Sequence, residues 1–257
     1  MQTNQNNQML IPKIMDKIRF SKNKIINTEF LNEYQIRIID KELQRNREKN
    51  YFFEGGYPDA ESKILIAYPE REEEAFIKQS IYSIIKAIKI ELPNEVHGKF
   101  EHRDYLGTLM SFGLSRDRIG DIIVYKDCAY IIVLEENVEY IKNSLNFEKR
   151  FKKAKISIIN IDEVKPKQIE FENIKISVNS TRLDSVISEL LNTSRRLAQE
   201  LIDLEKVSIN YSVETKYTKT IKEKDILIIR GRGKYIVNQF IGKNKKEKEV
   251  IEIKKYK

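Results

Sequence analysis

The sequence predicts a protein of the α+β class, because helical and strand-like patterns occupy separate stretches of its 257 residues. Three observations support this class. Helical periodicity dominates the start of the chain, strands and helices follow in the middle, and two amphipathic helices precede several strands near the end. Hydrophobic residues make up 40% of the chain, which is enough for folded cores. At roughly 100–200 residues per domain, the length predicts two or three compact units.

Residues 1–80 are predicted to form a mainly helical region. Its polar, uncharged start predicts a flexible tail over the first ten residues. Apolar residues then recur at helical spacing between Thr28 and Lys49, and Thr28 is an acceptable capping residue. Paired glycines and a proline end this pattern in a loop. A short apolar run, Ile64–Ala67, is a candidate strand.

Residues 81–165 are predicted to alternate in the order strand, helix, strand, strand, helix, strand. This order is typical of a ferredoxin-like α/β plait. Such a plait is a common platform for RNA, but it also hosts many other functions. The expected strands are 84–90, 121–125, 129–134 and 156–161, and the expected helices are 104–112, with Asp104 as its cap, and 135–145.

Residues 166–180 are predicted to be a connector, in which the segment 169–178 is either extended chain or a strand, and residues 181–257 are predicted to be a third unit. Two short amphipathic helices begin this unit, the first capped by Thr181 and the second by Ser194. Neither helix can bury its apolar stripe alone, so we expect both to pack on a sheet. The candidate strands are 207–211, 226–230, 235–240 and 250–253.

Positive charge gathers in this third unit. The chain carries a net charge of +8, and residues 181–257 hold 18 lysines and arginines against 11 acidic residues. The first 180 residues are almost balanced, with 29 basic and 28 acidic side chains. A lysine-rich genome would add lysine everywhere, so the asymmetry favours a polyanionic partner of the third unit.

Arginines, rather than the lysines of the tail, stand at the two helix starts. The first turn of a helix offers backbone N–H groups to a phosphate, and a guanidinium group adds bidentate contacts. A single arginine here is compatible with an ordinary exposed helix residue, but the set favours RNA binding. The candidate RNA-binding residues are Thr181, Arg182, Ser194, Arg195, Arg196, Gln199, Lys206 and Arg230.

Three segments in order, 181–184, 194–198 and 230–233, resemble the S4 RNA-binding domain. The resemblance implies an αα-β fold in which Arg182, Arg195 and Arg196 face the RNA backbone. It also implies that Asp184 and Asn210 hold the fold.

The chain departs from the S4 pattern at Glu205, where family members usually have glycine. Glycine supplies a left-handed end to the preceding helix. We therefore expect a strained or altered turn at Glu205 and, as a result, a changed direction of the Lys206 side chain.

The middle of the chain carries a second resemblance. The segments 53–57, 102–107 and 113–122 resemble the YlmH family of bacterial S4-domain proteins. The resemblance implies a helical N-terminal part, a plait-like RNA-binding domain and a C-terminal S4 domain. It further implies association with the large ribosomal subunit, a role in rescuing stalled ribosomes, and a link to the cell-division gene neighbourhood.

A second RNA surface is predicted at His102, Arg103, Arg116 and Arg118, whose arginines are suited to phosphate contacts. An alternative stays equally open: Arg116 and Arg118 belong to a solvated loop, and His102 caps a helix.

Catalytic and metal sites find little support in the sequence. His102-Arg103-Asp104 matches a kinase catalytic loop, but Leu109 stands where that loop needs asparagine. His97 and His102 are too few for a metal site, and the single Cys128 excludes an internal disulfide and is predicted to be buried.

We therefore expect no enzyme, no cofactor, no metal and no small-molecule substrate. The alternatives are an RNA-modifying enzyme of the pseudouridine-synthase kind and a cell-division adaptor. The expected partners are ribosomal RNA, transfer RNA and the large ribosomal subunit. No apolar run approaches the ~18 residues of a membrane helix and the start lacks a signal-peptide pattern, so we expect a cytoplasmic protein without a membrane partner.

Overall fold

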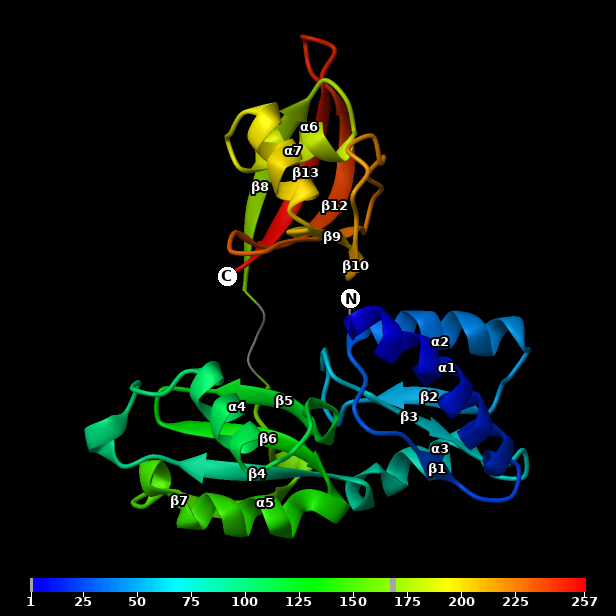
Figure 1. Cartoon of the computed structure of the whole chain (residues 1–257), viewed down its shortest axis with the longest axis vertical. Coiled ribbons are helices and arrows are strands. Elements are labelled where there is room, and N and C mark those ends of the chain that lie inside the picture. The colour runs from blue at the N-terminus through cyan, green and yellow to red at the C-terminus, as the bar shows by residue number, and fades with distance from the viewer. Residues whose placement is uncertain (1, 167–169) are drawn as a thin grey trace. The chain divides into compact units, whose positions relative to one another are not determined.

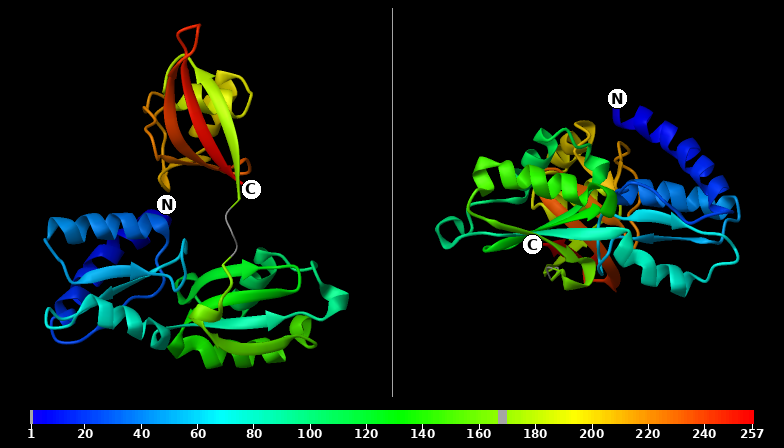
Figure 2. Two further views of the ribbon diagram at one scale, coloured as in Figure 1. Left: turned by 180° about the vertical axis from the view of Figure 1, so that it is seen from behind. Right: turned by 90° about the horizontal axis from the view of Figure 1, so that it is seen from below.

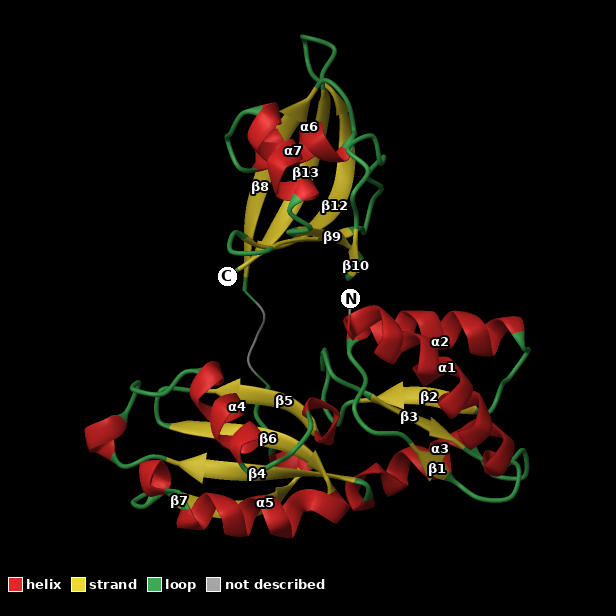
Figure 3. Ribbon diagram, in the orientation of Figure 1, coloured by secondary structure: helices red, strands yellow, loops and turns green. Residues whose placement is uncertain are grey.

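The computed structural model describes residues 2–166 and 170–257 (Figure 1). The chain divides into two compact units, Met1–Lys167 and Gln168–Lys257, called unit 1 and unit 2 below. Each unit combines helices with antiparallel sheet (Figure 3), so the predicted α+β class is confirmed. Within the described residues, no helix has both the length and the apolar character required to cross a membrane.

Unit 1 begins with two helices and a small sheet. The sheet is antiparallel, in the order β1-β3-β2, and its central strand is fully buried. One face of this strand packs against the two helices through Leu65 and Ala67. The elements are α1 (Gln2–Ser21), β1 (Ile26–Asn27), α2 (Glu33–Arg45), β2 (Tyr51–Glu54) and β3 (Ile64–Ala67).

Two predictions for this region are wrong. The first ten residues are not a flexible tail, because α1 begins at Gln2 and its Ile14 and Ile18 pack into the core. Thr28 does not cap α2. The cap is Asn32, which exchanges side-chain and backbone hydrogen bonds with Gln35 in a capping box. Thr28 is instead buried, and its hydroxyl accepts a hydrogen bond from the backbone of β3.

The second part of unit 1 is a four-stranded antiparallel sheet with the order β5-β6-β4-β7. The element order agrees with the predicted alternation. Helix α4 starts at His102, with Glu101 as its cap and Asp104 completing a capping box, rather than at Asp104. The elements are α3 (Glu74–Gln79), β4 (Ile85–Glu91), α4 (His102–Ser111), β5 (Ile119–Val124), β6 (Cys128–Leu134), α5 (Glu135–Phe147) and β7 (Lys155–Asn160).

Both faces of the four-stranded sheet are covered. Ile88 and Ile131 pack with α4 and α5 on one face. Ala87 and Ile132 pack on the other face with Ile64 and other residues that precede position 80. Since this shared core crosses the predicted boundary at residue 80, the two predicted regions form one compact unit.

Unit 2 is a six-stranded antiparallel sheet in the order β10-β9-β11-β12-β13-β8, with α6 and α7 on one face. Strand β8 pairs with β13 over its whole length, so the predicted connector at 166–180 contains an edge strand of this sheet. The elements are β8 (Phe171–Val178), α6 (Leu183–Leu190), α7 (Arg195–Asp203), β9 (Val207–Ile209), β10 (Ser212–Val213), β11 (Ile226–Ile229), β12 (Gly233–Lys243) and β13 (Glu249–Tyr256).

Glu205 ends α7 in the left-handed conformation, with a φ of 53°. The N–H groups of Glu205 and Lys206 donate to the carbonyls of Ile202 and Leu201, which is the pattern of a Schellman motif. The turn therefore keeps its left-handed form although a residue with a Cβ occupies it. For such a residue this conformation costs roughly 1–2 kcal/mol.

We expect Glu205→Gly to raise the free energy of unfolding of unit 2 by about 1 kcal/mol, because glycine adopts this φ without the Cβ clash. Hydrogen exchange of the unit 2 strands in the whole chain measures the change. Glu205→Ala removes the same carboxylate but keeps the Cβ, so it is the matched control. An equal gain in both variants would show that charge, rather than backbone strain, sets the effect.

Candidate nucleic-acid interface

The predicted RNA-binding residues of unit 2 gather around one buried carboxylate. Asp184 is fully buried in the first turn of α6. Arg195 donates to its two oxygens from Nε at 2.8 Å and Nη2 at 3.1 Å, and Arg182 does so from Nε at 3.2 Å and Nη2 at 3.3 Å. Gln199 adds a third side-chain donor at 3.0 Å. Two bidentate guanidinium groups and an amide thus share one acceptor.

These donors keep Asp184 ionised. Burial alone would raise the pKa of its carboxyl group, but the hydrogen bonds from Arg195, Gln199 and Arg182 outweigh burial and lower the pKa to about 2. An ionised carboxylate without such partners would be strongly destabilised in this position. Asp184 therefore holds the fold, as the S4 resemblance implies, through the side chains of Arg182, Arg195 and Gln199.

Both arginines present their outer edge to solvent. The exposed fraction is 38% for the side chain of Arg182 and 52% for that of Arg195. In each, Nε and Nη2 bind Asp184, and among the described residues Nη1 makes no further contact. Arg196 differs, because its side chain is 89% exposed and, among the described residues, its ion-pair partner is Glu200, at 3.3 Å. The site thus combines two guanidinium groups held by Asp184 with a third that pairs with an exposed glutamate.

One of the two helix caps predicted in unit 2 is confirmed and the other is wrong. Ser194 caps α7, accepting a hydrogen bond from the Leu197 N–H at 3.2 Å, as predicted. Thr181 does not cap α6, whose N-cap is Arg182. The Thr181 carbonyl instead accepts from Ile221, while the Leu183 N–H donates to the Lys219 carbonyl at 2.8 Å. The α6 start is therefore paired with the loop before β11.

That loop contributes a residue that sequence reasoning missed. Lys219 lies beside the backbone of Leu183, next to the arginine cluster. The only sequence signal for it is its place in a lysine-rich stretch, because the pairing with α6 joins segments far apart in the chain.

Lys206 and Arg230 form a separate pair at the ends of α7 and β11. The Arg230 N–H donates to the Lys206 carbonyl at 2.9 Å. Close by in sequence, Asn210 adopts a left-handed conformation and binds Asp225 and the Ile226 N–H. This turn agrees with the fold-holding role predicted for Asn210.

Because the pKa of Asp184 is lowered on folding, its stabilising effect is present above its ordinary pKa of 3.8 and is lost as pH falls toward 2. We expect Asp184→Asn to lower the free energy of unfolding of unit 2 at neutral pH by about 2 kcal/mol and to flatten its dependence between pH 4 and pH 2. Urea titrations followed by NMR signals of unit 2 measure both effects.

Glu189→Gln, an exposed change on the same helix, is the control for this prediction. If both variants kept the steep acid dependence, Asp184 would not be its source.

In unit 1, a second carboxylate joins the segments that carry the YlmH resemblance. Asp121, on β5, accepts hydrogen bonds from the Tyr57 hydroxyl at 2.7 Å and from the N–H groups of Glu61 and Ser62 at 2.8 Å and 3.0 Å. Burial has the largest effect on the pKa of the Tyr57 hydroxyl and raises it, and the charge of Asp121 raises it further. The loop after β2 is thereby fixed to the four-stranded sheet.

The residues of the predicted second RNA surface have partners within unit 1. Arg116 donates to the carbonyls of Ile119 and Gly120, and so holds the start of β5. Arg118 binds Glu136 at 2.9 Å, and Arg103 binds Glu101 at 3.2 Å.

His102 opens α4 beside this group. Desolvation and the charge of Arg116 lower the pKa of His102, against the opposing carboxylates of Asp121 and Glu61. The predicted second RNA surface therefore combines the structural contacts of Arg116 with the exposed side chains of Arg103 and Arg118.

We expect Tyr57→Phe to lower the free energy of unfolding of unit 1 by about 2 kcal/mol, because a hydrogen bond to a charged group is lost. Hydrogen exchange of β3 and β5 in the whole chain measures this loss. Tyr82→Phe, at a ring that is 45% exposed, is the matched control. Equal effects of the two substitutions would contradict a structural role of the Tyr57–Asp121 contact.

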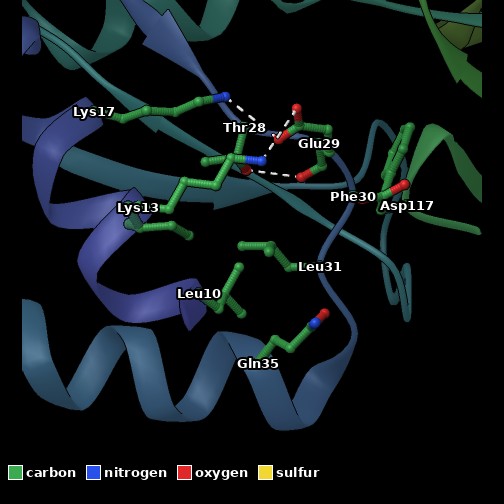
Figure 4. A pocket seen from close by; sticks show the side chains of 10 residues that line it. Leu10, Lys13, Lys17, Thr28, Glu29, Phe30, Leu31, Gln35 and Asp117 are labelled. Atoms are coloured by element: carbon green, nitrogen blue, oxygen red, sulfur yellow. Dashed lines mark hydrogen bonds and ion pairs between the residues drawn. The ribbon is translucent and has the colours of Figure 1, made fainter. Parts of the chain in front are cut away.

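Two cavities in unit 1 are weaker candidates for a functional site than the arginine cluster of unit 2. A cavity of about 50 Å³ lies beside α1, and Lys17 and Glu29 in its lining pair at 3.3 Å. Figure 4 shows the side chains that line this cavity. A larger hollow of about 440 Å³ contains Lys89, which pairs with Glu91, and the partly buried Cys128. Burial, and secondarily Asp127, raises the pKa of the Cys128 thiol. Among the described residues, no group of three or more acidic, histidine or cysteine side chains is arranged for a metal ion.

Comparison with known proteins identifies the class of the middle segment. Residues 73–165, which span α3 through β7, match the family described as "Putative RNA-binding domain in YlmH". The chain is thus an α+β protein whose residues 73–165 match this domain family.

The chain is also 28% identical over 225 residues to "Ribosome-associated protein quality control protein P2" of Bacillus subtilis (strain 168), covering 86% of this chain and 83% of that protein. A solved structure, "Cell division protein ylmH from Streptococcus pneumoniae", is 18% identical with a TM-score of 0.45, covering 63% of this chain and 92% of the other. The predicted resemblance to the YlmH family is confirmed. The S4 character of unit 2 stays a prediction.

Proposed function

We propose that this chain is a non-catalytic protein that docks on structured ribosomal or transfer RNA through unit 2, acting as an S4-type domain. The observation that carries the proposal is the pair of arginines oriented by the buried Asp184 at the starts of α6 and α7. The match to an RNA-binding domain in unit 1 and the ribosome-associated relative support it. By the family resemblance, the docking site is the large subunit of stalled ribosomes, in the cytoplasm.

The arrangement suits phosphate better than a neutral ligand. Asp184 fixes the planes of Arg182 and Arg195, so little side-chain entropy remains to be lost when Nη1 binds an oxygen. Arg196 stands at the first turn of α7, where the helix dipole also favours an anion. Lys206 and Arg230, and in unit 1 His102, Arg103 and Arg118, are further candidates for RNA contacts.

The two alternative functions make different predictions. An RNA-modifying enzyme would leave a modification missing when RNA from a deletion strain is digested and weighed by mass spectrometry. A cell-division adaptor that uses RNA only secondarily would keep its activity in cells when the arginine cluster is neutralised. The non-catalytic proposal requires an unchanged modification pattern and loss of activity.

Replacing all three arginines is a poor test, because it would leave the buried Asp184 carboxylate without a cationic partner, with Gln199 as its remaining side-chain donor, and would destabilise unit 2. We expect Arg196→Gln, which breaks only an exposed pair, to weaken binding to large ribosomal subunits and to lower the slope of log affinity against log salt by about 1. Sedimentation of the whole chain with subunits at several salt concentrations measures this slope.

Lys245→Gln, an equal change of charge in the exposed turn between β12 and β13, is the matched control. An Arg195→Gln, Asp184→Asn double variant extends the test to the fixed arginines without leaving a buried charge. If all three variants bound subunits equally well, the helix starts would not be the docking site.

A further inference from the structure

The face of the unit 2 sheet that lies opposite α6 and α7 has its own chemical character. Alternate residues of each strand point toward the helices and fill the core, among them Tyr235, Val237 and Ile253. Their neighbours point to the other side, which faces the viewer in the left panel of Figure 2. We call this side the open face, and define it by Phe171, Lys234, Ile236, Lys254 and Tyr256.

Strand register sets these side chains next to one another. Phe171 of β8 pairs with Tyr256 of β13, and Lys254 of β13 pairs with Ile236 of β12. The Phe171 and Tyr256 rings meet edge to face, with centroids 5.0 Å apart. They come from the first and last strands of the unit.

Ammonium groups lie over these rings. Lys234 Nζ is 4.5 Å from the centroid of Tyr256 and 5.1 Å from that of Tyr211, and Lys254 Nζ is 5.9 Å from that of Phe171. The side chains in these contacts are all partly exposed: Phe171, Tyr211, Lys234, Lys254 and Tyr256. Cations and aromatic faces thus form one surface across three neighbouring strands and the turn after β9.

The charge of the open face is positive. Lys175, which pairs with Glu252 in register, adds a third lysine to Lys234 and Lys254. Glu252 is the acidic residue of this stretch, and the amides of Asn238 and Gln239 bind its carboxylate at 2.7 Å and 3.0 Å. The face therefore suits a partner that offers both negative charge and flat apolar surfaces.

We propose that the open face binds a single-stranded segment of RNA, at a site separate from the helix starts. Unpaired bases stack on the Phe171 and Tyr256 rings in place of the ammonium groups of Lys254 and Lys234, and these ammonium groups turn to bind the adjacent phosphates. Double-stranded RNA does not fit this chemistry, because its base faces are covered by their neighbours in the stack. The site goes beyond the docking function proposed above and uses none of its residues.

The test measures binding of the whole chain to a fluorescent, unstructured RNA of about 12 nucleotides, a length within the usual range for such platforms. We expect Phe171→Leu with Tyr256→Leu to weaken binding at least tenfold, because stacking is lost while apolar side chains remain. Lys234→Gln with Lys254→Gln should weaken binding and lower the salt slope by about 1.4, at roughly 0.7 per phosphate contact on a single strand.

Lys245→Gln with Lys246→Gln, in the exposed turn between β12 and β13, is the matched control for charge. NMR spectra of unit 2 establish that each variant is folded. Failure of the unaltered chain to bind this RNA, or equal binding by folded open-face and control variants, would overturn the proposal. Ultraviolet crosslinks from the RNA to peptides that contain Phe171 or Tyr256 would support it, and crosslinks confined to residues 182–199 would overturn it.

Arg196→Gln separates this proposal from the docking function. A variant that loses sedimentation with large subunits but keeps single-strand binding supports the open face independently of the helix site. Open-face variants that lose subunit binding while keeping full affinity for the short RNA would point to a protein contact and would overturn the proposal.

Discussion

The organisation of unit 2 depends on one buried charge. Asp184 has no exposure to solvent, and a carboxylate in that position is compatible with folding only when it is paired. Three side chains donate hydrogen bonds to it. Arg182 lies just before α6, Arg195 lies at the start of α7, and Gln199 lies one turn further along α7. Arg195 and Gln199 join α7 to α6 through Asp184, and the two arginines balance its negative charge. Stability and the orientation of the candidate RNA contacts therefore arise from the same hydrogen bonds.

In unit 1, Asp121 likewise joins separate segments of the chain through hydrogen bonds to its carboxylate, but its donors are of a different kind. Its carboxylate accepts from Tyr57 and from two backbone N–H groups of the loop after β2, so the donors are neutral and no guanidinium group is oriented. Arg116 nearby binds backbone carbonyls of its own loop. Two of the three segments that resemble the YlmH family, 53–57 and 113–122, are thus joined by a contact that shapes the unit.

Local patterns predicted the element order well, because periodicity and turn residues act over a few positions. Ser194 as a cap follows from such a pattern. The cap of α2 was misplaced because Thr28 and Asn32 are both acceptable caps, and only the packing of Thr28 against β3 decides between them. The arginines were found as candidates, but their shared partner was not, since Asp184 also fits a helix-capping role. Strand β8 was ambiguous because its pairing partner, β13, lies at the far end of unit 2.

The same long-range pairing explains why no sequence pattern reveals the open face. Phe171 and Tyr256 look like isolated aromatic residues at the two ends of unit 2, and only the β8–β13 register makes them neighbours. A sheet with helices on one side must expose its other side or cover it with another surface. Aliphatic residues alone on that side would favour aggregation or a protein partner. Lysines placed over aromatic rings keep the side hydrated, and their flexible side chains can give up the ring faces to unpaired bases and bind the phosphates instead.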